Sequence, residues 1–394
     1  MAGRSFVESL ADWNANQYLR DLPWSRITPE VGESDQRIYE TITSTNLSEQ
    51  QANAIAHPGR SFPSVKHVLA VHWHPEFVPL GLIRERIDHL YPNRVDELII
   101  PTQHNQLLEW DGYSGVEVDC YATEFKEKIQ ILLHFASSSL DSASKLKAML
   151  DHTFRYRSSQ LFEFLDTLIE ENMEHRLLLA AQKTAASEEL IRFTRIHARR
   201  LRRLIRDNEA RTEPTMIKNK LVRNYFDRLR DQYDDRLIDQ VQEFARRVKK
   251  IVKANFDPSF FFTVQEVIEE ARLHNPIIIV PHPEQSWPVL LADYDVDGFE
   301  VWNPQSQDYT EFMIGVVHRL NTARPDRHPI LAMMGDDCHM GEKTKPKDKQ
   351  DPVKSVREIG LQPAWDELPI RKSLVLGNIR KESLIEEYRQ RLQG

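Results

Sequence analysis

The sequence predicts an α/β fold that carries a block of helices between two of its strands, and three observations lead to this prediction. Short aliphatic runs recur along the chain, with the composition of strands that are buried on both faces. Segments with apolar residues at helical spacing separate several of these runs, and such alternation is typical of an α/β barrel or a doubly wound sheet. Residues 140–253 contain no glycine and one proline, Pro214, which favours a continuous block of helices.

Seven strands and three helices of the α/β part are predicted. The strands lie at residues 67–72, 97–100, 115–119, 129–133, 276–280, 298–302 and 329–334. Apolar residues at helical spacing predict helices over 80–91 and 309–320. A third helix begins at Thr263-Val-Gln-Glu266, a capping box, and runs to about His274.

The helical block contains apolar stripes at the spacing that places side chains on one face of a helix. Two such stripes are Leu161, Phe164, Leu165 and Leu168, and Tyr225, Leu229, Tyr233 and Leu237. We therefore expect an all-helical insertion between the fourth and fifth strands.

One segment of this block, residues 192–206, carries seven arginines and no acidic residue. A basic helix can bind phosphate groups, and Arg199 and Arg203 are then candidate substrate contacts. Alternatively, the arginines form a solvated face beside a buried stripe that includes Phe193 and Leu201. No aromatic residues of the kind that stack on bases are interleaved with them.

Composition and charge restrict the class of protein. A chain of 394 residues with 40% hydrophobic content can bury a large core, and a formal net charge of −8 argues against coating nucleic acid. Two cysteines cannot form a disulfide framework and fit a reducing compartment. We find no signal peptide and no apolar run of the roughly 20 residues that span a membrane, so we expect a cytoplasmic protein without an obligate protein partner.

Histidines and carboxylates recur where the predicted strands end. The first strand leads into His72-Trp-His74, and the last leads into Asp337-Cys-His339. Alternate residues of a strand point to the same side, so the members of each pair can converge on one point. Imidazole and carboxylate groups together are ligands for a catalytic divalent metal ion. The end of a strand also supplies His104, Glu117 and His282.

These motifs resemble those of the PHP family, named for polymerase and histidinol phosphatase, whose members are metal-dependent phosphoesterases on a distorted seven-stranded β/α barrel. The matching motifs are His72-Trp-His74, Thr102-Gln103-His104, Gly115-Val-Glu117, Val280-Pro-His282-Pro283 and Gly335-Asp-Asp337-Cys-His339. The resemblance covers about 67–139 and 263–345. It implies a TIM-like barrel from residues 66–139 and 259–345. The sequence outside this barrel is divided into an N-terminal extension at 1–65, the helical insertion at 140–258 and a C-terminal segment at 346–394 that ends in a helix.

The resemblance also implies a ligand set for one to three divalent ions, which could be manganese, zinc or iron. The implied ligands are His72, His74, His104, Glu117, His282, Asp337 and His339, with His134 as a further candidate. Glu117 would bridge two ions, Asp337, His339 and His104 would be catalytic, and Lys343 is a candidate phosphate contact. Two positions depart from the family pattern. Pro79 replaces an acidic residue or histidine, for which Glu76 could substitute. Gln130 replaces a histidine, for which His134 could substitute only if the strand is bulged or its register is shifted.

Several neighbours of these motifs have two interpretations each. Glu300 either supports a ligand or is solvated at the rim, and Asp336 either supports a ligand histidine or caps a turn. Cys338 is either a nucleophile or a small buried residue. Glu284, Gln285 and Trp287 are candidates for lining the substrate cleft.

Together these features predict a metal-dependent hydrolase of phosphate esters that uses metal-activated hydroxide. Because the insertion would lie over the mouth of the barrel, we expect a small phosphorylated substrate or a short single-stranded nucleic acid. Two alternatives remain open. One is amidohydrolase-like cleavage of a C–N bond on the same scaffold, and the other is a catalytically degenerate metal-binding interaction protein.

Overall fold

The computed structural model describes residues 17–326 and 328–393, which form two compact units. The helical unit consists of residues 17–45 and Arg157–Asp257. The mixed unit consists of Asn46–Tyr156 and residues 258–393, and contains all the strands. In the part of the chain that is described, no helix combines the length and the apolar character that crossing a membrane requires.

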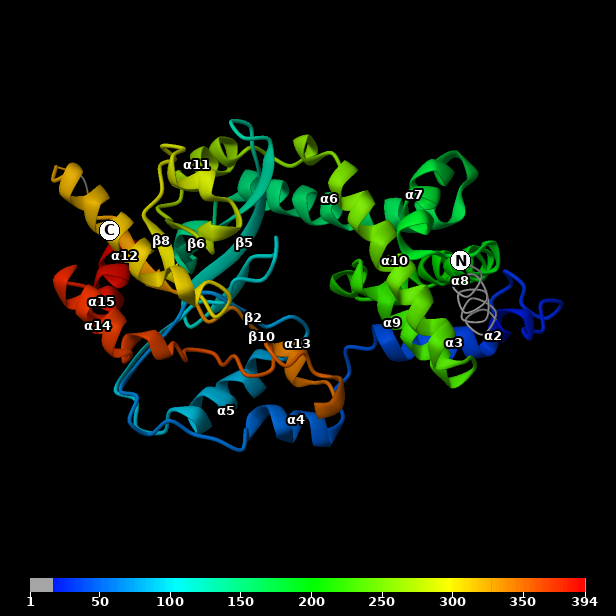
Figure 1. The fold of residues 1–394 in the computed structure, drawn as a ribbon. Helices are drawn as coiled ribbons and strands as arrows, with labels where there is room; N and C mark the ends of the chain where they lie inside the picture. The colour runs from blue at the N-terminus through cyan, green and yellow to red at the C-terminus, as the bar shows by residue number, and fades with distance from the viewer. Residues whose placement is uncertain (1–16, 327, 394) are drawn as a thin grey trace, which may run out of the picture. The chain divides into compact units, whose positions relative to one another are not determined.

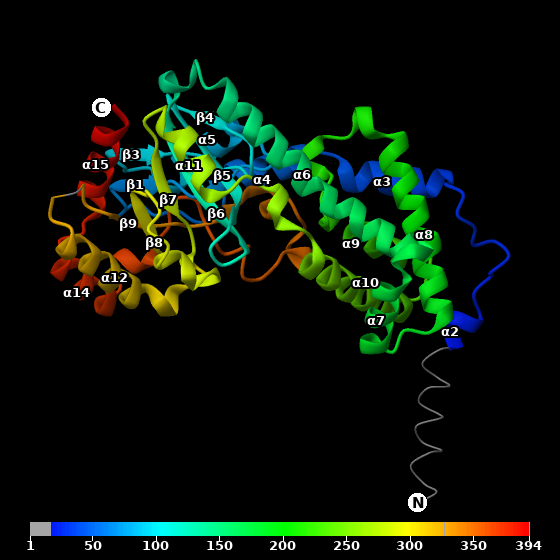
Figure 2. The same cartoon turned by 90° about the horizontal axis from the view of Figure 1, so that it is seen from above.

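The helical unit packs its helices side by side (Figure 2). It contains the second half of α6 (Ser144–Ile169), together with α7 (Glu174–Thr184), α8 (Glu188–Asp207), α9 (Lys220–Arg228) and α10 (Asp235–Asn255). The apolar stripes predicted from the sequence face its core: Leu161, Leu165, Tyr225 and Leu237 are all buried. The first stripe lies on one helix, α6. The second stripe does not, because α9 ends at Arg228 and α10 begins at Asp235, so Tyr225 and Leu237 lie on different helices.

Residues 17–45 pack within the helical unit. They include α2 (Gln17–Arg20) and α3 (Glu33–Thr43). On α3, Asp35 accepts a hydrogen bond from the Tyr225 hydroxyl at 2.9 Å, and the Tyr39 hydroxyl lies 2.9 Å from that of Thr212. The following helix α4 (Glu49–Ala56) belongs to the mixed unit. The first sixteen residues of the expected N-terminal extension lie outside the described part of the chain.

All seven predicted strands are present in the mixed unit. Some of them are labelled in Figure 1. They are β1 (His67–Ala70), β3 (Asp96–Ile99), β5 (Tyr113–Ala122), β6 (Glu127–Ala136), β7 (Ile277–Val280), β8 (Gly298–Trp302) and β9 (Leu331–Met334). The sequence did not predict three shorter strands, β2 (Trp73–His74), β4 (Leu108–Trp110) and β10 (Cys338–His339).

The prediction of a seven-stranded TIM-like barrel is wrong. The described strands form three separate sheets: one of six strands in the order β4-β5-β6-β7-β8-β9, and the pairs β1-β3 and β10-β2. A β/α barrel needs parallel strands joined by crossover helices. Here β5 and β6 form a long antiparallel hairpin, and β6 is also antiparallel to β7, so only β7, β8 and β9 run parallel within the large sheet.

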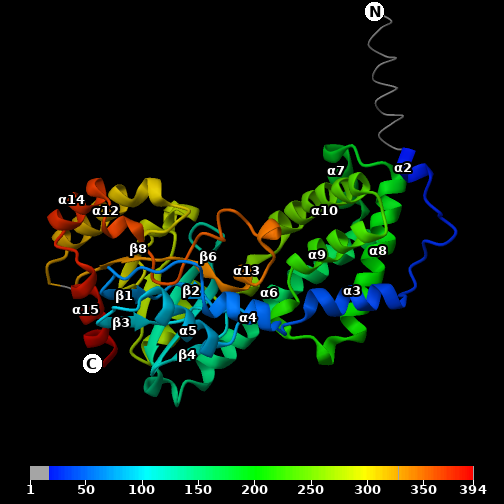
Figure 3. The same ribbon diagram turned by 90° about the horizontal axis from the view of Figure 1, so that it is seen from below.

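Helices cover the sheets of the mixed unit (Figure 3). The three predicted helices are α5 (Leu80–Leu90), α11 (Val264–Arg272) and α12 (Thr310–Ala323). The capping box at Thr263 is confirmed, because Thr263 Oγ1 and the Glu266 carboxylate each accept a hydrogen bond from the other residue's N–H. Near the C-terminus, α14 (Leu368–Leu376) precedes α15 (Lys381–Gln393). On α15, Ile385 and Tyr388 are fully buried in a core shared with Leu69 and Leu132.

Candidate metal centre

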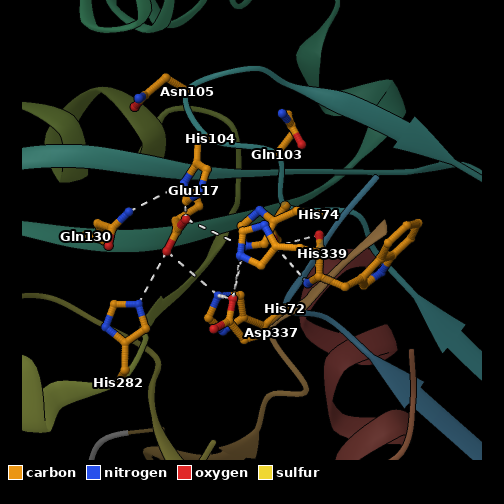
Figure 4. Close-up of polar contacts among 12 residues, drawn as sticks. His72, His74, Gln103, His104, Asn105, Glu117, Gln130, His282, Asp337 and His339 are labelled. Carbon is orange, nitrogen blue, oxygen red and sulfur yellow. Dashed lines mark hydrogen bonds and ion pairs between the residues drawn. The ribbon is translucent and has the colours of Figure 1, made fainter. Parts of the chain in front are cut away.

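The strand ends of the mixed unit bring seven of the predicted ligands together (Figure 4). The parallel pairing of β10 with β2 places His339 beside His74, and their rings stack with centroids 4.3 Å apart. An isolated bridge places His104 beside Glu117 of β5. His282 lies two residues after the end of β7, and its ring centroid is 5.7 Å from that of His72.

Glu117 lies between two sets of histidines. Its Oε1 atom is 3.4 Å from His282 Nε2 and 3.7 Å from His72 Nε2. Its Oε2 atom contacts His104 Nδ1 and is 3.8 Å from His74 Nε2. The two oxygens of one buried carboxylate thus face different histidines, as the resemblance implied for a bridging ligand.

Asp337 lies on the opposite side of His72 and His74. Its Oδ1 atom is 3.3 Å from His339 Nε2, 3.4 Å from His74 Nε2 and 3.9 Å from His72 Nε2. The backbone of Asp337 has a φ of 44°, a left-handed conformation that aspartate tolerates better than most residues. Its N–H donates a hydrogen bond to the carbonyl oxygen of His72 at 2.8 Å, which fixes this turn.

The donor atoms have the spacing that a divalent ion requires. Three groups have ligand atoms within 4.8 Å of one another: His74, His104 and His339; His72, His74 and Asp337; and His72, Glu117 and His282. Most separations between these nitrogens and oxygens are 3.3–3.9 Å. That is long for a hydrogen bond, but ligands about 2.1 Å from a tetrahedral ion are roughly 3.4 Å apart.

The ring nitrogens of the buried histidines support the same conclusion. Neither nitrogen of His74 has a hydrogen-bond partner within the described chain, nor has His72 Nε2, although both rings are fully buried. A buried polar atom without a partner destabilises a fold by about 1–3 kcal/mol. A divalent ion is the group that would satisfy several such nitrogens and the adjacent carboxylates at once. The residues present therefore fit a metal ion.

Charge in the cluster is arranged around ionised carboxylates. Burial disfavours the charged form of Glu117, but His104 and His282 hold its pKa well below the usual value. Burial also opposes ionisation of Asp337, whose pKa is held low by His339, His74 and His72. Against the effect of burial, Glu300 and then Asp337 raise the pKa of His72 to about 10. Burial, with the nearby His339 and His104, lowers the pKa of His74 to about 3. Both carboxylates therefore stay ionised although they are buried, and the ionised form is the one that binds a cation.

Glu300 supports His72. Its Oε1 atom accepts a hydrogen bond from His72 Nδ1 at 2.8 Å, and its Oε2 atom accepts the backbone N–H of His282 at 2.6 Å. Gly335 permits this close packing, because a Cβ atom at that position would lie 1.7 Å from Glu300 Oε1. Glu300 therefore orients a ligand rather than being solvated at the rim.

The two other open interpretations are also resolved. Asp336 accepts hydrogen bonds from the N–H groups of Cys338 and Gly360, so it caps a turn and does not contact a ligand histidine. Cys338 is fully buried, and burial raises the pKa of its thiol. It is a packing residue and not an activated nucleophile.

At the two departures from the family pattern, the structure shows which residues lie beside the ligands. Pro79 immediately precedes α5, and Glu76 instead supplies a carboxylate, with Oε1 3.8 Å from His339 Nδ1. Gln130 lies beside His104, with 3.5 Å between Gln130 Nε2 and His104 Nδ1. A polar side chain, Glu76 or Gln130, thus lies beside the ligands at each departure. The amide of Gln130 is a poor metal ligand.

Four other predicted residues lie elsewhere. His134 belongs to none of the three groups; it is buried on β6 beside the ring of Tyr388, and burial lowers its pKa to about 3. The Lys343 ammonium donates to the backbone oxygens of Ser355 and Arg357. Arg199 and Arg203 are exposed on α8 in the helical unit, where Arg203 pairs with Asp207.

Sequence reasoning missed two residues that bind Asp337. The guanidinium group of Arg357 contacts the Asp337 carboxylate and donates to its backbone oxygen at 3.0 Å. Gln305 Nε2 donates to Asp337 Oδ2 at 2.8 Å. Gln305 follows the strand end that carries Glu300, and this position is only a weak indication that it lies near the metal ligands. Arg357 lies beyond the region of resemblance, and nothing in its local sequence marks it.

Comparisons with known proteins add little to this description. No family model matches the chain, and no curated protein matches it. The chain is similar to the crystal structure of a Bifidobacterium adolescentis protein that has been proposed to be a metal-dependent phosphoesterase. The two are 14% identical with a TM-score of 0.39, over 79% of this chain and 96% of that chain. A likeness at this level establishes neither fold nor function, and membership of the PHP family stays a prediction.

Proposed function

We propose that this protein is a metal-dependent hydrolase of phosphate esters. The observation that carries the proposal is the buried cluster of His72, His74, Glu117 and Asp337, whose nitrogen and oxygen atoms have the spacing of metal ligands. Carboxylates shared among histidines are the ligands of centres that hydrolyse phosphate esters with one or two ions.

Two ions can be accommodated without sharing a residue. One would be held by His72, Glu117 and His282, and the other by His74, His104 and His339, because these two groups have no member in common. Asp337 would join the second group through Oδ1, which is 3.4 Å from His74 Nε2 and 3.3 Å from His339 Nε2. Imidazole ligands suit zinc and iron, and the carboxylates of Glu117 and Asp337 also suit manganese. When bound, such ions supply a water molecule of lowered pKa and positive charge that offsets the charge developing on phosphoryl oxygens.

The protein's own residues determine how a substrate would reach this centre. The side chains of His72, His74, Glu117 and His282 are at most 9% exposed, whereas those of His104 and His339 are 25% and 18% exposed. A phosphate ester would therefore approach on the side of His104 and His339. Glu300 would keep the His72 ring fixed during the approach, since it holds the nitrogen that faces away from the cluster.

The substrate proposed is a nucleotide, a sugar phosphate or a short oligonucleotide. The test is to load the metal-free protein with manganese, zinc or iron and to measure phosphate release from these compounds and shortening of labelled oligonucleotides. The control is His318→Ala, because His318 is an exposed histidine on α12 of the same unit. We expect wild type and His318→Ala to be active and His74→Ala to be inactive. A metal-loaded wild type that cleaves none of these esters, or cleaves only amides, would contradict the proposal.

A further inference from the structure

The two oxygens of the Asp337 carboxylate have different surroundings. Oδ1 faces the Nε2 atoms of His72, His74 and His339. Oδ2 instead accepts hydrogen bonds from the Arg357 guanidinium group and from Gln305 Nε2. One oxygen is thus directed at the candidate metal ligands, while the other is held by two donors from outside the ligand set.

Arg357 is fixed in a buried strap, which we define as residues 357–362. The carboxylate of Glu358 makes two hydrogen bonds to Arg86, at 2.7 and 2.6 Å. The carbonyl of Ile359 accepts the Tyr91 hydroxyl at 2.7 Å, and Gln362 Nε2 donates to the carbonyl of Leu69 at 2.6 Å. Irregular backbone is seldom buried unless its polar groups are paired, as they are here. The strap therefore holds Arg357 in one place.

The contacts of the Arg357 side chain are directed at Asp337. The residue is 4% exposed, and its guanidinium group contacts both the carboxylate and the backbone oxygen of Asp337. The guanidinium group therefore binds two acceptors of one residue, which fixes the Asp337 carboxylate relative to its own backbone.

We infer that Arg357 is a positioning residue, which with Gln305 keeps Oδ2 of Asp337 occupied so that the carboxylate meets a metal ion through Oδ1 alone. A charge-assisted bond from a rigid guanidinium group suits this role, because it fixes direction as well as distance. The inference rests on the proposed function only in requiring that the cluster binds an ion. It makes the C-terminal segment, which the family resemblance did not cover, part of the metal centre.

The experiment is a calorimetric titration of the metal-free full chain with Mn²⁺, comparing Arg357→Met, Arg357→Lys and Gln305→Leu with wild type. The matched control is Arg371→Met, because Arg371 is an exposed arginine on α14 of the same C-terminal segment. Loss of a residue that orients a metal ligand typically lowers affinity about 10–100-fold. We expect a loss of this size in Arg357→Met, smaller losses in Arg357→Lys and Gln305→Leu, and none in Arg371→Met.

Two further readouts separate positioning from simple stabilisation. Urea denaturation of each metal-free variant shows whether that variant is folded. If Arg357→Met is unfolded, Gln305→Leu still tests the inference, because Gln305 is exposed and its replacement should not disrupt the fold. The visible absorption of bound Co²⁺ reports coordination number. This absorption should weaken in Arg357→Met if both carboxylate oxygens of Asp337 then bind the ion. A low concentration of guanidinium chloride should restore the wild-type spectrum and affinity, whereas the same concentration of sodium chloride should not.

The outcomes also separate this inference from the proposed function. The inference would be overturned if a folded Arg357→Met had the Mn²⁺ affinity and the Co²⁺ spectrum of wild type. If Arg357→Met is unfolded, the same result in Gln305→Leu would overturn it. A wild type that binds Mn²⁺ but cleaves no phosphate ester would overturn the proposed function alone, provided that the variants lose affinity as expected. A wild type that binds no ion would overturn both.

Discussion

His72 donates a hydrogen bond from Nδ1 to Glu300 at 2.8 Å, and this contact turns its Nε2 atom toward Glu117 and Asp337. Glu300 and His72 are far apart in sequence and meet only because β8 and the end of β1 lie in the same unit. A carboxylate behind a ligand histidine fixes the tautomer and raises the basicity of the ring. The pair is therefore placed to support the candidate metal centre.

Replacing this carboxylate should weaken metal binding. In Glu300→Gln the side chain keeps its size but loses its charge, so we expect metal affinity to fall about 10–100-fold. Titration of the metal-free protein with Mn²⁺ measures the change. Glu311→Gln, an exposed position on α12, should bind as wild type does. Equal affinity in Glu300→Gln and wild type would show that Glu300 does not support a ligand.

Adding a histidine beside His104 should increase the amount of bound metal. Gln130 Nε2 is 3.5 Å from His104 Nδ1, so an imidazole at this position would add a nitrogen ligand next to the group of His74, His104 and His339. We expect Gln130→His to hold more metal per chain after gel filtration, measured by elemental analysis, and Gln130→Leu to hold no more than wild type. An unchanged metal content in Gln130→His would indicate that the added imidazole does not strengthen binding of an ion by the second group.

Removing the metal should destabilise the mixed unit. An ion that binds only the folded state stabilises it by about 2.7 kcal/mol when its concentration is 100 times the dissociation constant. Scanning calorimetry with added Mn²⁺ and with a chelator should show one transition that moves and another, from the helical unit, that does not. The His74→Ala variant should lack the shift. A wild-type protein in which no transition temperature changes on addition of Mn²⁺ would argue against a metal centre in this unit.

The strap should make stability depend on pH through Glu358. Burial opposes ionisation of this carboxylate, but Arg86, Lys343 and Arg60 lower its pKa below the usual value. Because its pKa is lower in the folded state than in the unfolded state, its contribution is fully present above about pH 4.3. The contribution is lost as pH falls through the folded pKa.

In Glu358→Gln we therefore expect a loss of about 3–5 kcal/mol in the free energy of unfolding at pH 7, since one partner of a buried pair is removed. The difference from wild type should shrink as the pH is lowered below 4. Urea denaturation at several pH values measures both quantities. A difference that stayed constant across this range would mean that the charge of Glu358 is not what stabilises the strap.

The sequence located the strands and most of the cluster, because both depend on local patterns. Aliphatic runs predicted seven of the ten described strands, and alternate spacing predicted pairs such as His72 and His74 that do face one region. The prediction of a barrel was wrong because the composition of a strand does not specify whether it runs parallel or antiparallel to its neighbours. The antiparallel pairing of β5 with β6 follows from the short turn at residues 123–126.

What the sequence could not give were contacts across long separations. Arg357 meets Asp337 only through the folding of the C-terminal segment, and buried arginines are uncommon enough that its position gave no signal. Similarly, His134 looked like a replacement ligand by proximity along β6. The antiparallel register pairs it with Gly115 rather than with Glu117, and the residue is not a member of any candidate group.

Anomalous diffraction from crystals of the manganese-loaded protein tests most directly whether the buried cluster is a metal centre. We predict a strong peak at the manganese edge about 2.0–2.3 Å from His72 Nε2, His282 Nε2 and a Glu117 oxygen. A second peak is predicted among His74, His104 and His339. Fully loaded crystals with no anomalous peak among these residues would contradict the account.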